Sequence, residues 1–221
     1  MAGGEIDLVD DEVDLGAGRR VRIARPRAPD ALLERAVSDG ASDAPYWAEL
    51  WPSARALAAH LASRDLRGVR AVELGCGLAL PGVVAALAGA EVLAVDHDAD
   101  SVEIAVRNGA QADGRLHGLV ADLRAPVPAL HEAAPFDLVL AADVLYEGPL
   151  ADALTRVIPL LTAPAGHALV AFPWRGQADA LASALEHAGM RVELSRIDAP
   201  DVLPVRTVGL LDAFWPAGPA V

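Results

Sequence analysis

The sequence predicts an α/β fold in which a mostly parallel sheet is covered by helices on both faces. Two observations carry this prediction. From about residue 50 onward, short apolar runs alternate with stretches of helical periodicity, and this alternation is typical of a parallel sheet. In addition, the segment AVELGCGLALPG at residues 71–82 places a glycine turn between an apolar run and a helix-compatible run. That order opens the nucleoside-binding half of many such sheets.

The apolar pattern predicts seven strands and five helices. The expected strands are residues 71–74, 92–96, 119–121, 136–142, 168–172, 191–194 and 207–211. The expected helices are residues 51–61, 81–88, 99–108, 149–161 and 177–188. Gly89, Gly109 and Gly189 follow three of these helices, where a glycine cap commonly ends a helix. The short gap between the last two strands predicts an antiparallel hairpin at one edge of the sheet.

The chain is expected to divide into an N-terminal extension, residues 1–45, and a main domain, residues 46–221. Within the extension, the segment VDLGAGRRVRI predicts a β-hairpin that turns at its glycines. Pro26 and Pro29 are expected to interrupt any regular element after the hairpin. The total length is sufficient for one well-packed domain of this class.

Composition argues against several classes of function. A net charge of −13 disfavours a nucleic-acid partner, because such partners need a basic surface. Without a membrane-length apolar run of about 20 residues or a signal-peptide pattern, a cytoplasmic protein is expected. No metal is expected either, because Cys76 is the only cysteine and the six histidines are scattered. All 18 basic residues are arginine, which excludes phosphate loops and Schiff-base chemistry that require lysine.

Carboxylates end the first three expected strands, at Glu73, Asp96 and Asp122. Asp96 is placed to accept hydrogen bonds from a ribose diol. Glu73 is expected either to bind an amino group of the ligand or to orient the glycine turn. Asp122 is expected to meet an adenine amino group, with Leu123 packed beside it. The alternative is that these acids only cap the helices that follow.

The glycine turn favours S-adenosylmethionine over NAD as the ligand. NAD needs a helix N-terminus with closely spaced glycines to hold its pyrophosphate. This chain has Gly75 and Gly77, but Ala79 follows, and Pro81 precedes the next glycine. Because S-adenosylmethionine carries no phosphate, it does not need that arrangement.

Three segments resemble methyltransferase family 16: PYWAELWPSARALAAHL, VELGCGLALPG and FDLVLAADVLYE. The family includes protein lysine methyltransferases, among them those acting on the β subunit of electron-transfer flavoprotein. The resemblance covers roughly residues 45–172. It implies a class I, seven-strand Rossmann-like methyltransferase sheet with one antiparallel edge strand, and it implies S-adenosyl-L-methionine as the cofactor.

The resemblance also assigns site residues, because Trp51, Glu73, Gly75, Gly77, Asp96 and Ala142 match cofactor-binding positions of the family. Together with their neighbours Cys76 and His97, and with Asp122 and Leu123 from the strand-end pattern, these are the expected cofactor-binding residues. The Asp-x-x-Tyr signature of the family falls on Asp143 and Tyr146, which are the expected catalytic residues. The chain departs from the family pattern at Ala79, where many members have a third glycine, and after Asp122, where no tryptophan follows.

The activity that the resemblance implies is N-methylation of a protein lysine. We also expect the protein to be a monomer. Such a transfer needs mainly alignment and desolvation. Asp143 is expected to hold the incoming ammonium, and Tyr146 to orient the amine, with Trp174 on the same rim. Alternatively, Asp143 caps the helix that begins near Pro149 and Tyr146 covers the end of the sheet. Two other functions stay open: methylation of a small-molecule amine of the nicotinamide type, and a non-catalytic S-adenosylmethionine-binding domain.

Overall fold

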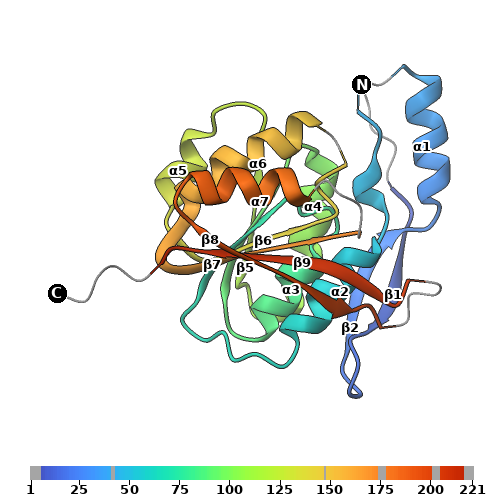
Figure 1. Cartoon of the computed structure of the whole chain (residues 1–221). Helices are drawn as coiled ribbons and strands as arrows, with labels where there is room; N and C mark the ends of the chain where they lie inside the picture. The colour runs from blue at the N-terminus through green and yellow to red at the C-terminus, as the bar shows by residue number, and fades with distance from the viewer. Residues whose placement is uncertain (1–5, 41–42, 147, 174–177, 201–204, 217–221) are drawn as a thin grey trace.

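The main feature of the protein is a seven-stranded sheet with strand order β5-β4-β3-β6-β7-β9-β8 (Figure 1). The computed structural model describes residues 6–40, 43–146, 148–173, 178–200 and 205–216. The strands are β3 (Arg70–Leu74), β4 (Glu91–Asp96), β5 (Leu116–Val120), β6 (Phe136–Ala142), β7 (Thr162–Phe172), β8 (Arg191–Asp198) and β9 (Thr207–Phe214). The predicted seven-strand sheet is confirmed.

Only β9 runs opposite to its neighbours in this sheet, since it pairs antiparallel with both β7 and β8. The predicted antiparallel hairpin at one edge is therefore confirmed. The strand that is reversed lies one position inside the edge, and β8 forms the edge itself.

Helices cover both faces of the sheet, as predicted (Figure 1). One face carries α2 (Pro52–Leu61), α3 (Leu80–Leu87) and α4 (Ala99–Gly109), and the other carries α5 (Pro128–Ala133), α6 (Gly148–Leu161) and α7 (Ala178–His187). In β6, Leu138 and Leu140 join the first core, whereas Val139 and Ala141 join the second. Because both faces are buried, the central strand β6 buries four consecutive residues, 138–141, rather than alternate ones. In the part of the chain that the structure describes, no helix has the length and apolar character needed to span a membrane.

The predicted N-terminal hairpin is formed by β1 (Leu8–Asp14) and β2 (Arg20–Pro26). It packs against the main domain through Asn108 on α4. The Asn108 amide accepts a hydrogen bond from the Ala24 N–H at 2.7 Å and donates to the carbonyls of Ala24 and Leu78. The hairpin is thus joined through one buried side chain to the loop that follows the glycine turn. The division of the chain at residue 45 stays a prediction.

Several local predictions were wrong. The helix α5 was not among those predicted, and β8 and β9 each end later than predicted. Pro29 begins a helix, α1 (Pro29–Ser38), instead of interrupting regular structure, because proline is well suited to the first turn of a helix. β5 starts three residues earlier than predicted, with Gly118 inside it, where a Cβ atom would lie 2.5 Å from Val102 Cγ1. β7 includes Pro164 and Gly166, two residues typical of turns, next to an irregularity in its pairing with β6.

Candidate active site

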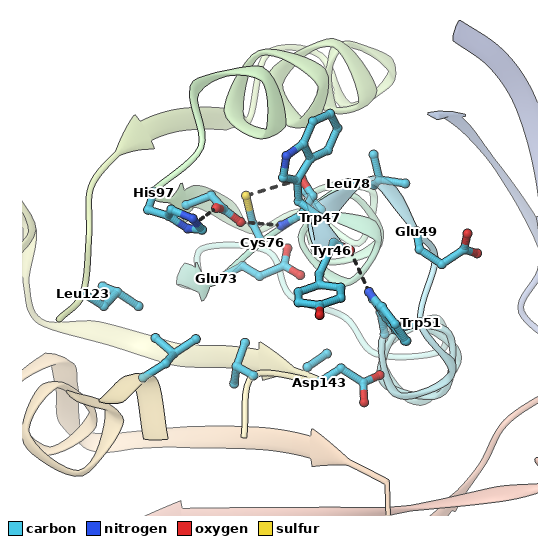
Figure 2. A pocket seen from close by; sticks show the side chains of 18 of the residues that line it. Tyr46, Trp47, Glu49, Trp51, Glu73, Cys76, Leu78, His97, Leu123 and Asp143 are labelled. Atoms are coloured by element: carbon cyan, nitrogen blue, oxygen red, sulfur yellow. Dashed lines mark hydrogen bonds and ion pairs between the residues drawn. The ribbon is translucent and has the colours of Figure 1, made fainter. Parts of the chain in front are cut away.

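All twelve residues that the sequence assigned to the site line one cleft at the carboxyl end of the sheet (Figure 2). They come from the ends of β3, β4 and β6, the segment after β5, and the start of α2. Parallel strands bring their carboxyl ends to the same edge, which explains how residues far apart in sequence meet here. The structure establishes that these residues lie together, whereas their individual roles stay predictions.

The glycine turn after β3 has a geometry that side chains would disturb. Gly75 has a φ of +64°, and a Cβ atom there would lie 2.7 Å from Val144 Cγ1. Gly77 has a φ of +52° and lies against the backbone of Trp47. Ala79, the departure from the family pattern, also adopts a left-handed φ of +57°. A glycine at position 79 would adopt this conformation without strain.

Glu73 is 2% exposed and binds the start of α3. Its Oε2 atom accepts a hydrogen bond from the Gly82 N–H at 2.8 Å. Of the two roles expected for Glu73, the structure therefore displays the one that orients the turn. Burial raises the pKa of Glu73 to about 8, with the nearby Asp96 charge acting in the same direction and the Gly82 N–H opposing it.

Asp96 ends β4 and binds the turn from the other side. Its carboxylate accepts hydrogen bonds from the backbone N–H groups of Gly77 at 3.0 Å and Asp98 at 3.1 Å, and it lies 3.1 Å from His97 Nδ1. Burial by itself would raise the pKa of Asp96, but these three partners outweigh it and lower the pKa. A charged acceptor is thus held at the strand end, as ribose binding requires.

Asp122 lies two residues beyond β5 and is bound by Arg124. The Arg124 Nε atom lies 2.9 Å from Asp122 Oδ1, and its Nη1 atom lies 3.2 Å from Asp43 Oδ1. The hydrogen bonds from Arg124 lower the pKa of Asp122. This pairing links the part of the cleft next to Leu123 to the segment before α2. Sequence reasoning did not assign Arg124 to the site.

Asp143 follows β6 and adopts a left-handed φ of +56°. Its carboxylate accepts a hydrogen bond from the Ser53 N–H at 2.9 Å, and its own N–H donates to the Ala171 carbonyl at 3.0 Å. Ser53 lies in the first turn of α2, so the carboxylate caps α2. The sequence offered a cap on the helix that follows Asp143 as an alternative role. In the structure, Asp143 instead caps α2, whose residue Ser53 lies 90 residues earlier in the chain.

Three exposed aromatic side chains stand beside Asp143, and we call Tyr46, Trp51 and Tyr146 the aromatic rim. The Tyr46 ring meets Trp51 and Tyr146 edge-on, with centroid distances of 6.3 and 5.4 Å. The Trp51 Nε1–H donates to the Tyr46 carbonyl at 2.8 Å. Sequence reasoning missed Tyr46, although its motif PYWAELW was among the segments on which the family resemblance depends. Trp174, also expected on this rim, lies outside the described residues.

Residues 41–182 match a protein family described as lysine methyltransferase. The chain belongs to this family. It is 30% identical over 185 residues to the electron transfer flavoprotein beta subunit lysine methyltransferase of Danio rerio, a match covering 77% of this chain and 65% of that protein. It is also 35% identical over 143 residues to the ribosomal protein L11 methyltransferase of Synechococcus sp. (strain RCC307), covering 64% of this chain and 46% of that protein. The chain thus spans less than two thirds of the length of these curated relatives.

Solved structures confirm the fold of this lysine methyltransferase family member. Magnesium protoporphyrin IX methyltransferase from Synechocystis PCC 6803, solved with bound S-adenosylmethionine, aligns with a TM-score of 0.54 and 15% identity over 86% of this chain and 79% of that one. The cyclase SpnF aligns with a TM-score of 0.58 and 18% identity over 74% of this chain and 81% of that one. Because a cyclase shares the fold, the fold alone does not decide the reaction.

S-adenosylmethionine is the cofactor that the family implies, and the cleft fits it. Gly75 and Gly77 present bare backbone where a ligand must approach closely. Asp96 offers an ionised acceptor at the strand end. Trp47, missed by sequence reasoning, lines the same cleft and carries an indole N–H that is buried and has no partner among the described residues. The thiol of Cys76 is buried, which raises its pKa and disfavours thiol chemistry at this residue.

Replacing Glu73 with glutamine is expected to remove a pH dependence of stability. Between its ordinary pKa of 4.5 and its folded pKa of about 8, the folded protein holds a proton that the unfolded chain has lost. The contribution of Glu73 to the free energy of unfolding is therefore largest below the lower pKa. It falls by up to about 1.4 kcal/mol per pH unit as the pH rises toward 8. The glutamine side chain still accepts a hydrogen bond from the Gly82 N–H but cannot ionise. As the pH rises across this range, the free energy of unfolding of the variant should therefore increase relative to that of the wild type.

Urea unfolding at several pH values between about 5 and 9 measures this difference. The quantity to compare is the free energy of unfolding of Glu73→Gln minus that of the wild type, because other groups titrate equally in both. A difference that does not change with pH would show that Glu73 is already ionised in the folded protein.

Proposed function

We propose that this protein transfers the methyl group of S-adenosylmethionine to a lysine side chain of a protein substrate. The observation that carries the proposal is the composition of the cleft's two ends. The glycine turn and Asp96 form a donor end, and Asp143 with the aromatic rim forms an end suited to a cation. A carboxylate and aromatic rings are the groups that hold an ammonium ion. The Danio rerio relative is named as a lysine methyltransferase of a protein subunit, which supports a protein lysine as the acceptor.

The residues of the chain would contribute binding and orientation. S-adenosylmethionine supplies an electrophilic methyl group bound to a sulfonium. A lysine, with a reference pKa of about 10.4, arrives mainly protonated, and Asp143 would hold its ammonium while Tyr146 and Tyr46 surround the aliphatic chain. The proton must leave to water before the amine attacks. The amine then forms the new N–C bond as the C–S bond breaks, and the rings keep water away from the reacting amine.

Transfer of labelled methyl groups tests this proposal directly. The purified chain is incubated with methyl-tritiated S-adenosylmethionine and a cell extract that lacks this protein, and the labelled products are separated and hydrolysed. The expected product is methyl-lysine in a protein. Because the chain contains no lysine, any methyl-lysine formed must come from another protein, which removes self-methylation as an explanation.

The other outcomes separate the alternatives. Label found only in small molecules would overturn the protein substrate and favour an amine methyltransferase of the nicotinamide type. Binding of S-adenosylmethionine without any transfer would favour a non-catalytic binding domain. Label in nucleic acid would overturn both amine acceptors.

A further inference from the structure

Glu49 is the one charged side chain of the cleft for which the described part of the chain supplies no partner. Its side chain is exposed and takes part in no ion pair or hydrogen bond with the residues described. The other charged side chains that line the cleft are each held by a hydrogen bond or an ion pair: Glu73, Asp96, His97, Asp122, Arg124 and Asp143. The Glu49 carboxylate is therefore available to a group that arrives from outside the chain.

The backbone around Glu49 turns its side chain outward, beside the aromatic rim. Glu49 and Trp51 both have extended conformations, with φ and ψ of −109° and 147° at Glu49 and of −66° and 149° at Trp51. Side chains alternate in direction along an extended chain, and Leu50, which lies between the two, is buried in the core. Glu49 and Trp51 therefore both point away from the core. Figure 2 shows Trp51 between Glu49 and Asp143, with the Glu49 carboxylate pointing outward at the margin of the cleft.

We propose that Glu49 selects protein acceptors in which an arginine or a second lysine lies within about three residues of the target lysine. Asp143 holds the target ammonium in the proposed function, and Glu49, on the other side of Trp51, pairs with the second cation. Three residues of extended chain span about 10 Å, which is enough to pass one aromatic side chain. The inference rests on the proposed function and narrows its substrate class to a lysine in a basic segment, which the net charge of −13 also favours. Glu49 takes no part in the chemical step.

Replacing Glu49 with glutamine tests the proposal, because the variant keeps the shape of the side chain and loses its charge. The KM for the acceptor protein identified by labelled transfer should rise by about two- to fivefold, the range typical of an exposed ion pair. The value of kcat and the affinity for S-adenosylhomocysteine should stay at the wild-type values. Glu186→Gln is the matched control, because Glu186 is exposed on α7, also has no partner among the described residues, and lies outside the cleft. An unchanged KM in Glu49→Gln overturns the proposal.

The salt dependence of KM separates recognition from a structural role. Glu49 lies shortly before Pro52, where α2 begins, and a negative charge there also favours the helix end. A purely structural role would change the unfolding temperature of Glu49→Gln and leave the salt dependence of KM equal in wild type and variant. Recognition predicts that the KM of the wild type rises more steeply with salt than that of the variant, because salt screens the ion pair that the variant lacks. Equal salt dependence overturns the proposal.

A charge swap between the enzyme and its acceptor gives the sharpest test. Mass spectrometry locates the methyl-lysine sites labelled in the extract, and each should have an arginine or a lysine within about three residues. Replacing that neighbour with glutamate in the purified acceptor should lower kcat/KM for the wild-type enzyme by about tenfold, because two carboxylates then face each other. Glu49→Arg should show the reverse preference and methylate the glutamate variant faster than the natural acceptor.

Two kinds of failure are distinguishable. If the wild-type protein transfers no methyl group to any protein, the proposed function fails and this inference fails with it. If the wild-type protein methylates lysines that have no neighbouring cation, or if the charge swap does not reverse the preference, only the role of Glu49 is overturned.

Discussion

Replacing Asp143 with asparagine is expected to lower kcat/KM for the protein acceptor by about 10- to 100-fold without weakening donor binding. A hydrogen bond to a charged group contributes about 1.5–3 kcal/mol, which corresponds to this range of rates. Asparagine is a precise probe here. Its amide oxygen still accepts from the Ser53 N–H, and it tolerates the left-handed φ of +56° at this position. The substitution therefore removes the charge and leaves the cap on α2 in place.

Two measurements make this prediction specific. Initial rates of methyl incorporation into the acceptor protein give kcat/KM, and calorimetric titration with S-adenosylhomocysteine gives donor affinity. Asp98→Asn is the matched control, because Asp98 also caps a helix, accepting from Asp100 and Ser101 at the start of α4. It should retain the wild-type rate. If Asp143→Asn also retained it, the Asp143 carboxylate would serve only to cap α2.

The donor end of the site could be predicted from the sequence because its determinants are local. The order of β3, glycine turn, α3 and β4 lies within residues 70–96. The two glycines, the strand-end carboxylate of Asp96 and the helix after them can each be recognised from neighbours a few residues away. The same locality explains why the hairpin of β1 and β2 was found: its glycines lie between two strand-like runs.

The acceptor end depends on contacts that no local pattern records. Asp143, for example, caps a helix 90 residues away. Tyr46 and Trp47 lie in a single short helical turn, which has no periodicity long enough to mark which side chains face inward. Their aromatic character alone fitted packing equally well. Only the folded arrangement shows that Tyr46 joins the rim and that the backbone of Trp47 lies against the glycine turn.

Replacing Gly75 with alanine is expected to disable both ends of the cleft at once. The left-handed φ of +64° costs an alanine about 1–2 kcal/mol. The new Cβ would also lie 2.7 Å from Cγ1 of Val144, a buried side chain next to Asp143. Overpacking of this kind costs about 1–3 kcal/mol. We therefore expect the free energy of unfolding to fall by about 2–5 kcal/mol, and donor affinity and methyl transfer to fall by at least tenfold, because the turn and the Asp143 segment must move apart.

A control and a second substitution separate strain from collision. Gly18→Ala, in the hairpin, has a similar φ of +74° with no atom within 4 Å of the new Cβ, so it should show the conformational cost alone and leave binding unchanged. Val144→Ala removes the colliding Cγ1, and the next Val144 atom, its Cβ, lies at an ordinary 3.9 Å from the Gly75 position. The double variant should therefore be more stable than the sum of the two single effects by about 1–3 kcal/mol, measured by urea unfolding. Simple additivity would show that Gly75 is required for its backbone conformation only, because two residues that collide cannot act independently.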